Sequence, residues 1–420
     1  MREMKDSGIS WVGEIPKEWS VNRAKYCFVN TKEIAGCRSD RYERLALTMN
    51  GVIKRSKDDS NGLQPEKFET YQILRPDELV FKLIDLQNVS TSRVGLSPYL
   101  GLVSPAYIIL KSNKRVLPAF AEKYFLMLWK NQIFNALGDA GVRSNLNSND
   151  LLELSIPFPS LVEQQRIAEF LDRECGKIDG LKADIQEQID TLEQYKRSII
   201  TEAVTHGLNP SAPMKDSGAG WMPLIPLHWK ADKLKFHLRQ RGIKNQIDKQ
   251  VLSLYREYGI VPKDSRDDNH NVTSEDVSDY RYVRVGDFVV NKMKAWQGSV
   301  AVSDYEGIVS PAYFVYEFSD DLINKRYFHY LMRNKTYATE FRRLSGGIRE
   351  GQWDLPSEAL NNTSILLPPL DEQQEIADYL DNKCAEIEQI IADKKSQIET
   401  LDGYKKSLIY EYVTGKKEVG

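Results

Sequence analysis

Two stretches of the sequence repeat apolar residues every seven positions, and each predicts a long helix. In the first stretch the repeating residues are Leu171, Ile178, Ile185, Leu192 and Ile199, with Cys175, Leu181, Ile189 and Tyr195 interleaved. In the second stretch they are Leu380, Ile387, Leu401 and Leu408. Lys394 takes the central apolar position there, which predicts a local shift of the apolar seam to Ile391 and Ile398. Heptads of this kind are typical of coiled-coil helices.

Flanking residues indicate where the first helix begins and ends. Ser160 and Glu163 form a capping-box pattern, and Gly207 and Pro210 are helix-stop residues. We therefore expect a helix of about 45 residues, or ~67 Å. In the second stretch Pro369 stands where Ser160 caps the first helix.

The two helices are expected to pair within one chain. Helices that belong to two copies of a repeat and are related by a pseudo-two-fold axis run antiparallel. The same heptads also permit a solvated pair that only spaces the domains, or a coil that joins two chains. We favour an intramolecular pair with a partner-binding surface, because polar and charged positions are crowded along both helices.

The remaining sequence mixes strand and helix patterns. Short β-rich runs such as 78–81 and 287–290 alternate with helical patterns such as 120–134 and 325–341. We expect an α+β protein in which two repeated globular domains are separated by two long helices that form an intramolecular antiparallel coiled coil. The expected segments are a first domain with its N-terminal segment (1–157), a helix with its linker (158–210), a second domain (211–366) and a final helix (367–420).

Nearly every motif occurs twice, in the same order. Met4–Gly8 returns as Met214–Gly218, and the Val-Ser-Pro-Ala-Tyr of 103–107 returns at 309–313. The Glu-Gln-Gln of 163–165 returns at 372–374, and Trp11, Ile15-Pro16 and Trp19 also have counterparts. A period near 210 residues indicates two copies of a domain-sized unit. We expect the tryptophan segments to pack in the domain cores.

The charge changes sign along this repeat. Residues 17–157 contain 20 Lys+Arg against 15 Asp+Glu, and residues 227–366 contain 21 against 19. The helical stretches are acidic, with 6 against 10 in 158–210 and 7 against 12 in 367–420. The net charge of −3 for the whole chain therefore does not argue against two basic, nucleic-acid-binding domains.

Several classes of protein are disfavoured. No apolar run approaches the roughly 18 residues of a membrane span, and no signal peptide is recognisable, so a cytoplasmic protein is expected. The four cysteines show no C-x2-C pairing and the five histidines have no metal-ligand spacing beside them. We expect reduced, mostly structural cysteines and no metal site. No phosphate-loop, dinucleotide-binding, zinc-protease, methyltransferase or nuclease motif is found, so no catalytic residue is assigned.

Candidate DNA-binding residues occur at matching places in both copies. A glycine-bent loop presents an arginine in each copy, and arginine can bind guanine or phosphate; an ion pair that holds the loop is an equal alternative. Basic residues beside an aromatic residue also follow a predicted strand, where ordinary surface lysines are at least as good an explanation. The candidates are Lys82, Arg143, Ser144, Asn145, Lys292, Lys294, Trp296, Arg349 and Gln352. The Ser-Pro-Ala-Tyr segments favour a structural turn, although Ser104 and Ser310 could donate to phosphate.

The chain resembles the specificity (S) subunit, or HsdS family, of type I restriction-modification enzymes. The resemblance rests on W-x3-I-P-x2-W, the Ser-Pro-Ala-Tyr block, and E-Q-Q-x-I-A-x-x-L-D followed by a heptad helix, all present twice. It implies two target recognition domains that read a bipartite double-stranded DNA site, with the helices as a spacer. It also implies two methyltransferase subunits docked on the helices, and motor-nuclease subunits.

The resemblance assigns the chemistry to the partner subunits. S-adenosylmethionine, ATP and Mg are expected there, for adenine-N6 methylation and ATP-dependent cleavage, and no cofactor is expected in this chain. Two alternatives remain: a self-contained DNA-modifying enzyme, disfavoured by the missing catalytic motifs, and a coiled-coil scaffold without DNA specificity. Methylation by the isolated chain would favour the first, and absence of any sequence preference in the complex would favour the second.

Overall fold

The chain folds into two compact units, each containing one globular domain. The structure, a computed structural model, describes residues 2–59, 67–84, 86, 92–138, 145–222, 224–256, 258–265, 273–274, 276–347 and 353–420. Unit 1 contains Met1–Ile185 and Lys395–Gly420, and unit 2 contains Gln186–Lys394. Helices α4 (Leu161–His206) and α8 (Leu370–Val413) each contribute one half to each unit.

Unit 1 combines short strands with three helices besides α4 and α8. Its strands are β1 (Met4–Asp6), β2 (Glu14–Pro16), β3 (Ser20–Arg23), β4 (Phe28–Asn30), β5 (Arg44–Thr48), β6 (Gly51–Arg55), β7 (Gln72–Leu74), β8 (Glu78–Phe81), β9 (Val94–Leu96), β10 (Gly101–Val103), β11 (Ile108–Ser112) and β12 (Ser155–Phe158). Its helices are α1 (Pro118–Lys130), α2 (Ile133–Gly138) and α3 (Ser148–Glu153).

Unit 2 repeats much of this order. Its strands are β13 (Met214–Asp216), β14 (Leu224–Pro226), β15 (Lys230–Lys233), β16 (Leu238–Arg241), β17 (Leu252–Tyr255), β18 (Gly259–Pro262), β19 (Arg281–Val283), β20 (Phe288–Asn291), β21 (Val300–Val302), β22 (Gly307–Val309), β23 (Tyr313–Phe318) and β24 (Ser364–Leu367). Its helices are α5 (Lys325–Arg333), α6 (Lys335–Leu344) and α7 (Ser357–Asn361).

The two domains share one sheet topology. A four-stranded antiparallel sheet has the order β4-β11-β8-β9 in unit 1 and β16-β23-β20-β21 in unit 2. The predicted run 78–81 is strand β8, whereas the predicted helix 120–134 is divided into α1 and α2. The predicted helix 325–341 is divided into α5 and α6 at Asn334, whose side chain accepts hydrogen bonds from Thr336 and Tyr337 and starts a new helix.

Each domain packs on the helix pair through one continuous apolar core. In unit 1, Phe81, Phe125 and Leu128 belong to the same cluster as Leu171 and Leu408 of the long helices. In unit 2 the cluster likewise joins the domain to Val204 of α4 and Leu380 of α8. The expected core role of the tryptophan segments is confirmed, because Trp19 and Trp229 are fully buried in these clusters.

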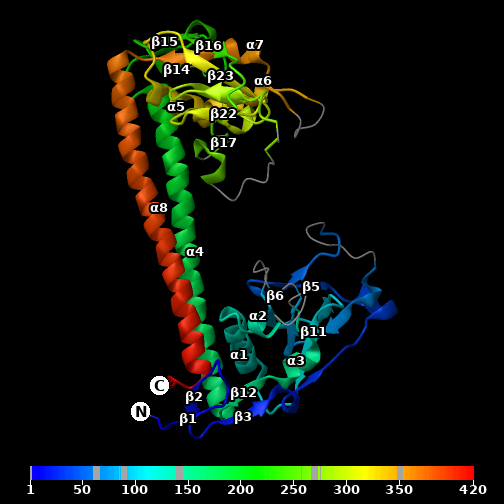
Figure 1. Ribbon diagram of the computed structural model, residues 1–420. Coiled ribbons are helices and arrows are strands. Elements are labelled where there is room, and N and C mark those ends of the chain that lie inside the picture. Colours follow the sequence, from blue (N-terminus) through cyan, green and yellow to red (C-terminus); the bar gives the residue numbers. More distant parts are fainter. Residues whose placement is uncertain are drawn as a thin grey trace. The chain divides into compact units, whose positions relative to one another are not determined.

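Helices α4 and α8 lie side by side and run antiparallel (Figure 1). In unit 1, Lys182 contacts Asp402 at 2.5 Å and Lys405 contacts Asp179 at 2.6 Å. In unit 2, the Lys394 ammonium donates to Gln188 at 2.5 Å. The antiparallel coiled coil expected from the heptads is therefore confirmed.

The heptad residues form the seam, with one correction. Leu171, Ile178, Leu380, Ile387, Ile391 and Leu408 are buried, and Ile185, Leu192, Ile199, Ile398 and Leu401 are half-buried. Cys175 and Ile189 are also buried, but Leu181 and Tyr195 are both 53% exposed, so their assignment to the seam was wrong. Heptad spacing from Cys175 leads to positions 182 and 196, where two lysines form ion pairs across the helices. Each of the two misassigned residues precedes such a position by one residue, which turns its side chain about 100° away.

A buried glutamine locks each domain to the start of its long helix. The Gln164 carbonyl accepts the Leu117 N–H at 2.8 Å, and its amide donates to the Pro159 carbonyl at 2.9 Å. Gln373 accepts the Asn324 N–H at 2.8 Å in the same way. These contacts account for one position of the repeated Glu-Gln-Gln motif.

The neighbouring glutamate of the motif behaves differently in the two copies. Glu163 accepts a hydrogen bond from the Trp19 indole at 2.9 Å and pairs with Arg2. Its carboxylate is thereby used in tertiary contacts, and only the Ser160 half of the predicted capping box forms, with the Glu163 N–H at 3.3 Å from the serine hydroxyl. In unit 2 the corresponding glutamate, Glu372, contacts His228. The Trp229 indole N–H has no partner among the described residues.

The cysteines are free, as expected. Cys27, Cys175 and Cys384 are buried, and burial raises the pKa of all three thiols; Cys37 is exposed. Burial and a raised pKa make the three buried thiols unreactive, which agrees with a structural role.

Candidate nucleic-acid interface

The Ser-Pro-Ala-Tyr segments form the same turn in both domains. The Tyr107 N–H donates to the Ser104 carbonyl at 3.1 Å, and the Tyr313 N–H donates to the Ser310 carbonyl at 3.0 Å. Each serine hydroxyl accepts from the N–H two residues later, at 3.3 and 3.4 Å. Both serine side chains therefore close a turn, which supports the structural interpretation of the motif.

A polar side chain from a neighbouring strand clamps each turn. The Gln72 amide donates to the carbonyls of Ser104 and Tyr107, at 3.1 and 2.8 Å. Arg281 donates to the Tyr313 carbonyl at 2.6 Å. Gln72 pairs with Val103 and Arg281 pairs with Val309, so the two clamps occupy equivalent positions although their residue types differ. Because their residue types differ, a comparison of the two copies in the sequence did not indicate these clamping residues.

Next to the turn, the structure joins the two segments that contain the predicted DNA-binding residues. In unit 1 the Leu146 N–H donates to the Leu83 carbonyl at 3.0 Å, which brings the neighbours of Lys82 and Asn145 together. In unit 2 the Leu355 N–H donates to the Lys292 carbonyl at 2.9 Å. In each domain, residues from distant parts of the sequence therefore meet beside the Ser-Pro-Ala-Tyr turn. We call this surface the turn face: it consists of the turn together with the segments around Leu83 and Leu146 in unit 1, and around Lys292 and Leu355 in unit 2.

The turn face of unit 1 is hollowed. A cavity of about 220 Å³ lies between Gln72, Pro105, Tyr107, Leu146 and Asn147. Burial raises the pKa of Tyr107, so its hydroxyl stays protonated and can donate a hydrogen bond.

The predicted side chains in unit 2 have distinct environments. The Lys292 ammonium contacts the Asp354 carboxylate at 3.0 Å. Lys294 is exposed, and its ammonium has no partner within the described ranges. Trp296 is half-buried and its indole N–H donates to the Met293 carbonyl at 3.1 Å. Lys294 is therefore the more available cation for a phosphate.

The other predicted residues are less completely characterised. Lys82 is half-buried and Asn145 is exposed. Arg143, Ser144, Arg349 and Gln352 lie outside the described residues, so their predicted roles stay predictions.

Two residues that the sequence did not indicate join this region. Trp353 packs edge-on against Trp296, with ring centroids 5.6 Å apart and planes at 61°. The Arg342 guanidinium lies 5.7 Å from both ring centroids. The position of Trp353 beside Gln352 was a usable signal, but nothing in the local sequence linked Arg342 to either tryptophan.

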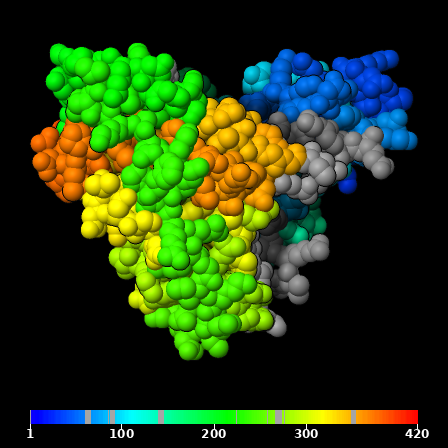
Figure 2. Space-filling model, turned by 90° about the horizontal axis from the view of Figure 1, so that it is seen from above, coloured from blue at the N-terminus to red at the C-terminus, as the bar shows by residue number. Residues whose placement is uncertain are grey.

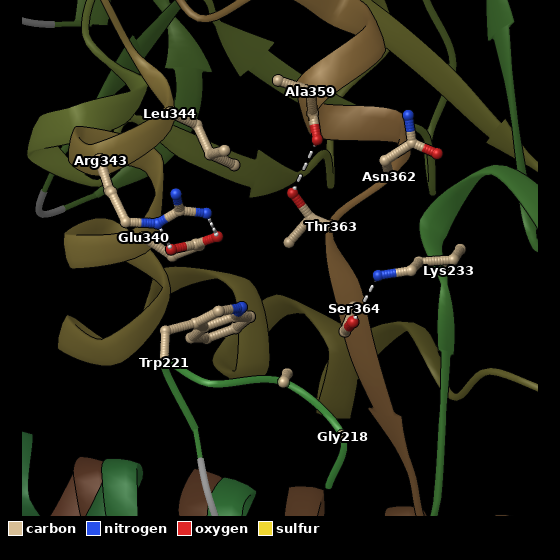
Figure 3. Close-up of a pocket in the computed structure, with 11 residues that line it drawn as sticks. Gly218, Trp221, Lys233, Glu340, Arg343, Leu344, Ala359, Asn362, Thr363 and Ser364 are labelled. Atoms are coloured by element: carbon tan, nitrogen blue, oxygen red, sulfur yellow. Dashed lines mark hydrogen bonds and ion pairs between the residues drawn. The ribbon is translucent and has the colours of Figure 1, made fainter.

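A separate pocket of about 350 Å³ lies in unit 2 (Figure 3). Arg343 in its wall forms a two-pronged ion pair with buried Glu340, with both hydrogen bonds at 2.7 Å. Lys233 donates to the Ser364 hydroxyl at 2.9 Å. None of the predicted residues that the structure describes lines this pocket, and both of its cations have partners.

Neither a metal site nor a membrane helix is found in the described part of the chain. Within it, no group of three or more His, Cys, Asp or Glu side chains is placed to hold a metal ion. No helix there is both long and apolar enough to cross a membrane.

Two repeated α+β domains on an antiparallel helix pair, with dissimilar residues around matching turns, make this a two-domain repeat protein. The sequence matches the family described as type I restriction modification DNA specificity domain over residues 57–191 and 243–400. These matches cover more than half of the chain, and the protein belongs to this family.

Several known proteins are similar over long stretches. The putative type I restriction enzyme MjaX specificity subunit of Methanocaldococcus jannaschii is 23% identical, and the alignment covers 97% of this chain and 96% of that protein. The type I restriction enzyme EcoKI specificity subunit of Escherichia coli is 22% identical, with 59% and 54% covered. A solved structure described as "Structural basis underlying complex assembly and conformational transition of the type I R-M system" shares the fold, with a TM-score of 0.68 at 14% identity, covering 96% of this chain and 99% of that one.

Proposed function

We propose that this chain is the DNA sequence-specificity subunit of a type I restriction-modification complex and has no catalytic activity of its own. Each domain reads one half of a bipartite site in double-stranded DNA, and the helix pair sets the distance between the halves. The observation that carries this proposal is the repeated turn face: one scaffold is built twice, and different polar residues surround it in each copy. Two domains that bind different DNA sequences are expected to share a scaffold and to differ in the polar residues around it.

The exposed residues of the helix pair support docking of two identical partners. Leu181 and Tyr404 are exposed in unit 1, and Ile390 and Tyr195 are exposed in unit 2, with exposed fractions between 44% and 57%. Both pairs follow the repeat, since Leu181 and Ile390, like Tyr195 and Tyr404, are 209 residues apart.

The register of the two helices places the exposed residues of each unit at the same level, so that Leu181 with Tyr404, and Ile390 with Tyr195, each form one patch with a residue from both helices. Lys182 contacts Asp402 and Asp179 contacts Lys405, so Leu181 lies level with Tyr404 on the neighbouring helix. Single exposed apolar residues are ordinary on protein surfaces, but their retention at equivalent positions of both copies indicates a shared contact. We infer that each patch docks one methyltransferase subunit.

The chemistry of the complex belongs to the partners in this proposal. Two methyltransferase subunits use S-adenosylmethionine to methylate adenine at N6. Motor-nuclease subunits use ATP and Mg for cleavage. This chain supplies the sequence readout and the docking surfaces, and on its own it is expected neither to methylate nor to cut DNA.

The first test maps methylated adenines in cells that express this chain with its methyltransferase. A bipartite motif with a fixed spacer is expected. Methylation by the isolated chain, or a complex without sequence preference, would contradict the proposal.

Domain exchange tests the division of labour between the two readers. Replacing residues 17–157 with the corresponding domain of another family member is expected to change only one half-site. A change in both half-sites would contradict the assignment of one half-site to each domain. Arg143→Ala and Arg349→Ala are each expected to weaken methylation through their own half-site. Wild-type methylation in both variants would indicate that these arginines have a structural role instead.

A helix insertion tests the spacer. Adding four residues near Gln188 lengthens α4, a helix of 46 residues, by about 6 Å. Half-sites one DNA turn apart are ~34–36 Å from centre to centre, so the unread spacer should lengthen while both half-sites keep their bases. Altered half-site bases would contradict this role of the helices.

Partner docking is tested by stoichiometry. Leu181→Ser with Tyr404→Ser is expected to give complexes with one methyltransferase subunit in place of two, measured by native mass spectrometry. Val29→Ser is the matched control, because Val29 is 59% exposed in the same unit and its counterpart Arg239 is not apolar. Two subunits on the double variant would refute this docking surface.

A further inference from the structure

The turn face of unit 2 contains an aromatic cluster, and the sequence of unit 1 has no aromatic residues at the corresponding positions. Trp296 and Trp353 pack edge to face, and the Arg342 guanidinium lies over both rings at 5.7 Å. We call these three residues the indole–arginine patch. In unit 1 the corresponding segments, 82–93 and 139–146, contain no aromatic residue.

The patch is fixed in place by three elements of the domain. The Trp296 indole N–H is held by the Met293 carbonyl, Arg342 comes from the last turn of α6, and Trp353 precedes Leu355, whose N–H binds the Lys292 carbonyl. These contacts restrict the side chains of the patch, and a restricted Trp and Arg cluster loses less entropy on binding, which favours a contact site.

The surroundings of the patch are cationic and partly apolar. Lys294 is exposed, and Met293, between Lys292 and Lys294, is 45% exposed. In Figure 2 the gold residues, which by the colour bar belong to the part of unit 2 around α6, lie at the molecular surface. Positive charge beside two half-buried aromatic side chains matches a nucleic acid, which offers phosphates and base faces together.

We propose that the indole–arginine patch contacts bases of the half-site read by the second domain, and so gives that half-site a contact chemistry that the first domain does not use. The inference rests on the proposed function and adds two specificity-determining residues, Trp353 and Arg342. The aromatic rings contact base faces or edges, and Arg342 holds them while adding positive charge near the phosphates.

The contrast between matched and unmatched surface residues supports this assignment. Exposed apolar residues that recur in both copies suit a partner that binds twice. The patch occurs in one copy only, on the face where predicted DNA-binding residues converge, which suits a ligand that differs between the two domains. A second protein partner would have no reason to need an unmatched site beside the turn face.

The test uses the assembled complex with its methyltransferase and a set of duplexes that carry single-base changes in each half-site. Trp353→Ala and Arg342→Ala are expected to slow methylation of the intact target by about 10- to 100-fold, in line with the contribution of a base–aromatic contact. Base changes in the second half-site should then be discriminated less strongly, while discrimination in the first half-site keeps its wild-type value.

Arg343→Ala is the matched control. Arg343 follows Arg342 on the same helix, but its guanidinium pairs with Glu340 in the wall of the separate pocket drawn in Figure 3, which no residue of the patch lines. It should keep wild-type discrimination in both half-sites. Trp353→Phe retains an aromatic ring and should recover part of the loss, and thermal unfolding of every variant checks that unit 2 is folded.

The outcomes separate this inference from the proposed function. A wild-type complex without sequence preference contradicts the proposed function itself. A sequence-specific wild type, combined with unchanged discrimination in folded Trp353→Ala and Arg342→Ala complexes, overturns the inference alone. Equal loss of discrimination in both half-sites also overturns it, because the patch would then act on binding in general. If Trp353→Ala does not fold, Trp353→Phe and Arg342→Ala decide the question by the same criteria.

Discussion

The sharpest structural prediction concerns the glutamine that locks the first domain to α4. Gln164 is fully buried and bonds two backbone groups, the Leu117 N–H and the Pro159 carbonyl. Gln164→Leu keeps the volume of the side chain but removes both partners. A buried polar group left without a partner costs about 1–3 kcal/mol, so we expect unit 1 to lose about 2–5 kcal/mol.

The next residue supplies a matched control for this variant. Gln165 is exposed and its side-chain amide donates to Glu169 within its own helix. Gln165→Leu is expected to change the unfolding free energy by less than about 0.5 kcal/mol. The comparison isolates the buried hydrogen bonds from the general effect of placing leucine near the helix start.

Differential scanning calorimetry and urea unfolding measure the difference. For domains of this size each kcal/mol shifts the melting temperature by about 2–4 °C, so the Gln164→Leu transition should fall by about 4–20 °C. The lock also fixes the residue before α1, and methylation by the complex should decline in parallel. A Gln164→Leu protein that melts within about 1 °C of the Gln165→Leu protein would refute the reasoning.

Four further variants test other contacts. Trp19→Phe and Trp229→Phe both shrink a fully buried side chain, but Trp19→Phe also removes a hydrogen bond to the Glu163 carboxylate, whereas the Trp229 indole N–H has no partner among the described residues. Trp19→Phe should therefore cost about 1.5–3 kcal/mol more than Trp229→Phe, and equal losses would contradict this. Burial, with nearby arginines, lowers the pKa of His329 to about 3. As the pH is lowered from 6.5 to about 3, this histidine is protonated in the unfolded state but not in the folded state, so the free energy of unfolding falls by about 1.4 kcal/mol per pH unit. His329→Phe should remove that part of the pH dependence of urea unfolding, and an unchanged slope would exclude this residue. Lys394→Ile restores an apolar seam position at the loss of one exposed contact and should stabilise unit 2 by up to about 1 kcal/mol; clear destabilisation would show that the contact matters more than burial.

The repeated and the unrepeated surfaces of this protein have different physical roles. Retained exposed residues, such as Leu181 and its counterpart Ile390, lie on the helix pair. The aromatic residues Trp296 and Trp353 lie on the turn face of one domain only. A partner present twice constrains both copies equally, whereas two different DNA half-sites allow each domain to change independently.

The sequence by itself determined the periodic features. Heptad spacing predicted both long helices and most of their seam, because a helix places residues seven apart on the same face whatever surrounds it. The repeat predicted two equivalent domains, and strand β8 followed from a local apolar run. These features depend on residues close in sequence, or on a comparison of the chain with itself.

Only the tertiary structure decided which residues meet. Leu181 fitted an apolar pattern but is 53% exposed, because the seam passes through Cys175 and Lys182, and only the paired helices show that this lysine takes the seam position. Gln72 clamps a turn more than thirty residues away, and Arg342 meets Trp296 from another element. Such contacts are set by chain folding over long sequence separations, and no local pattern of residues encodes them.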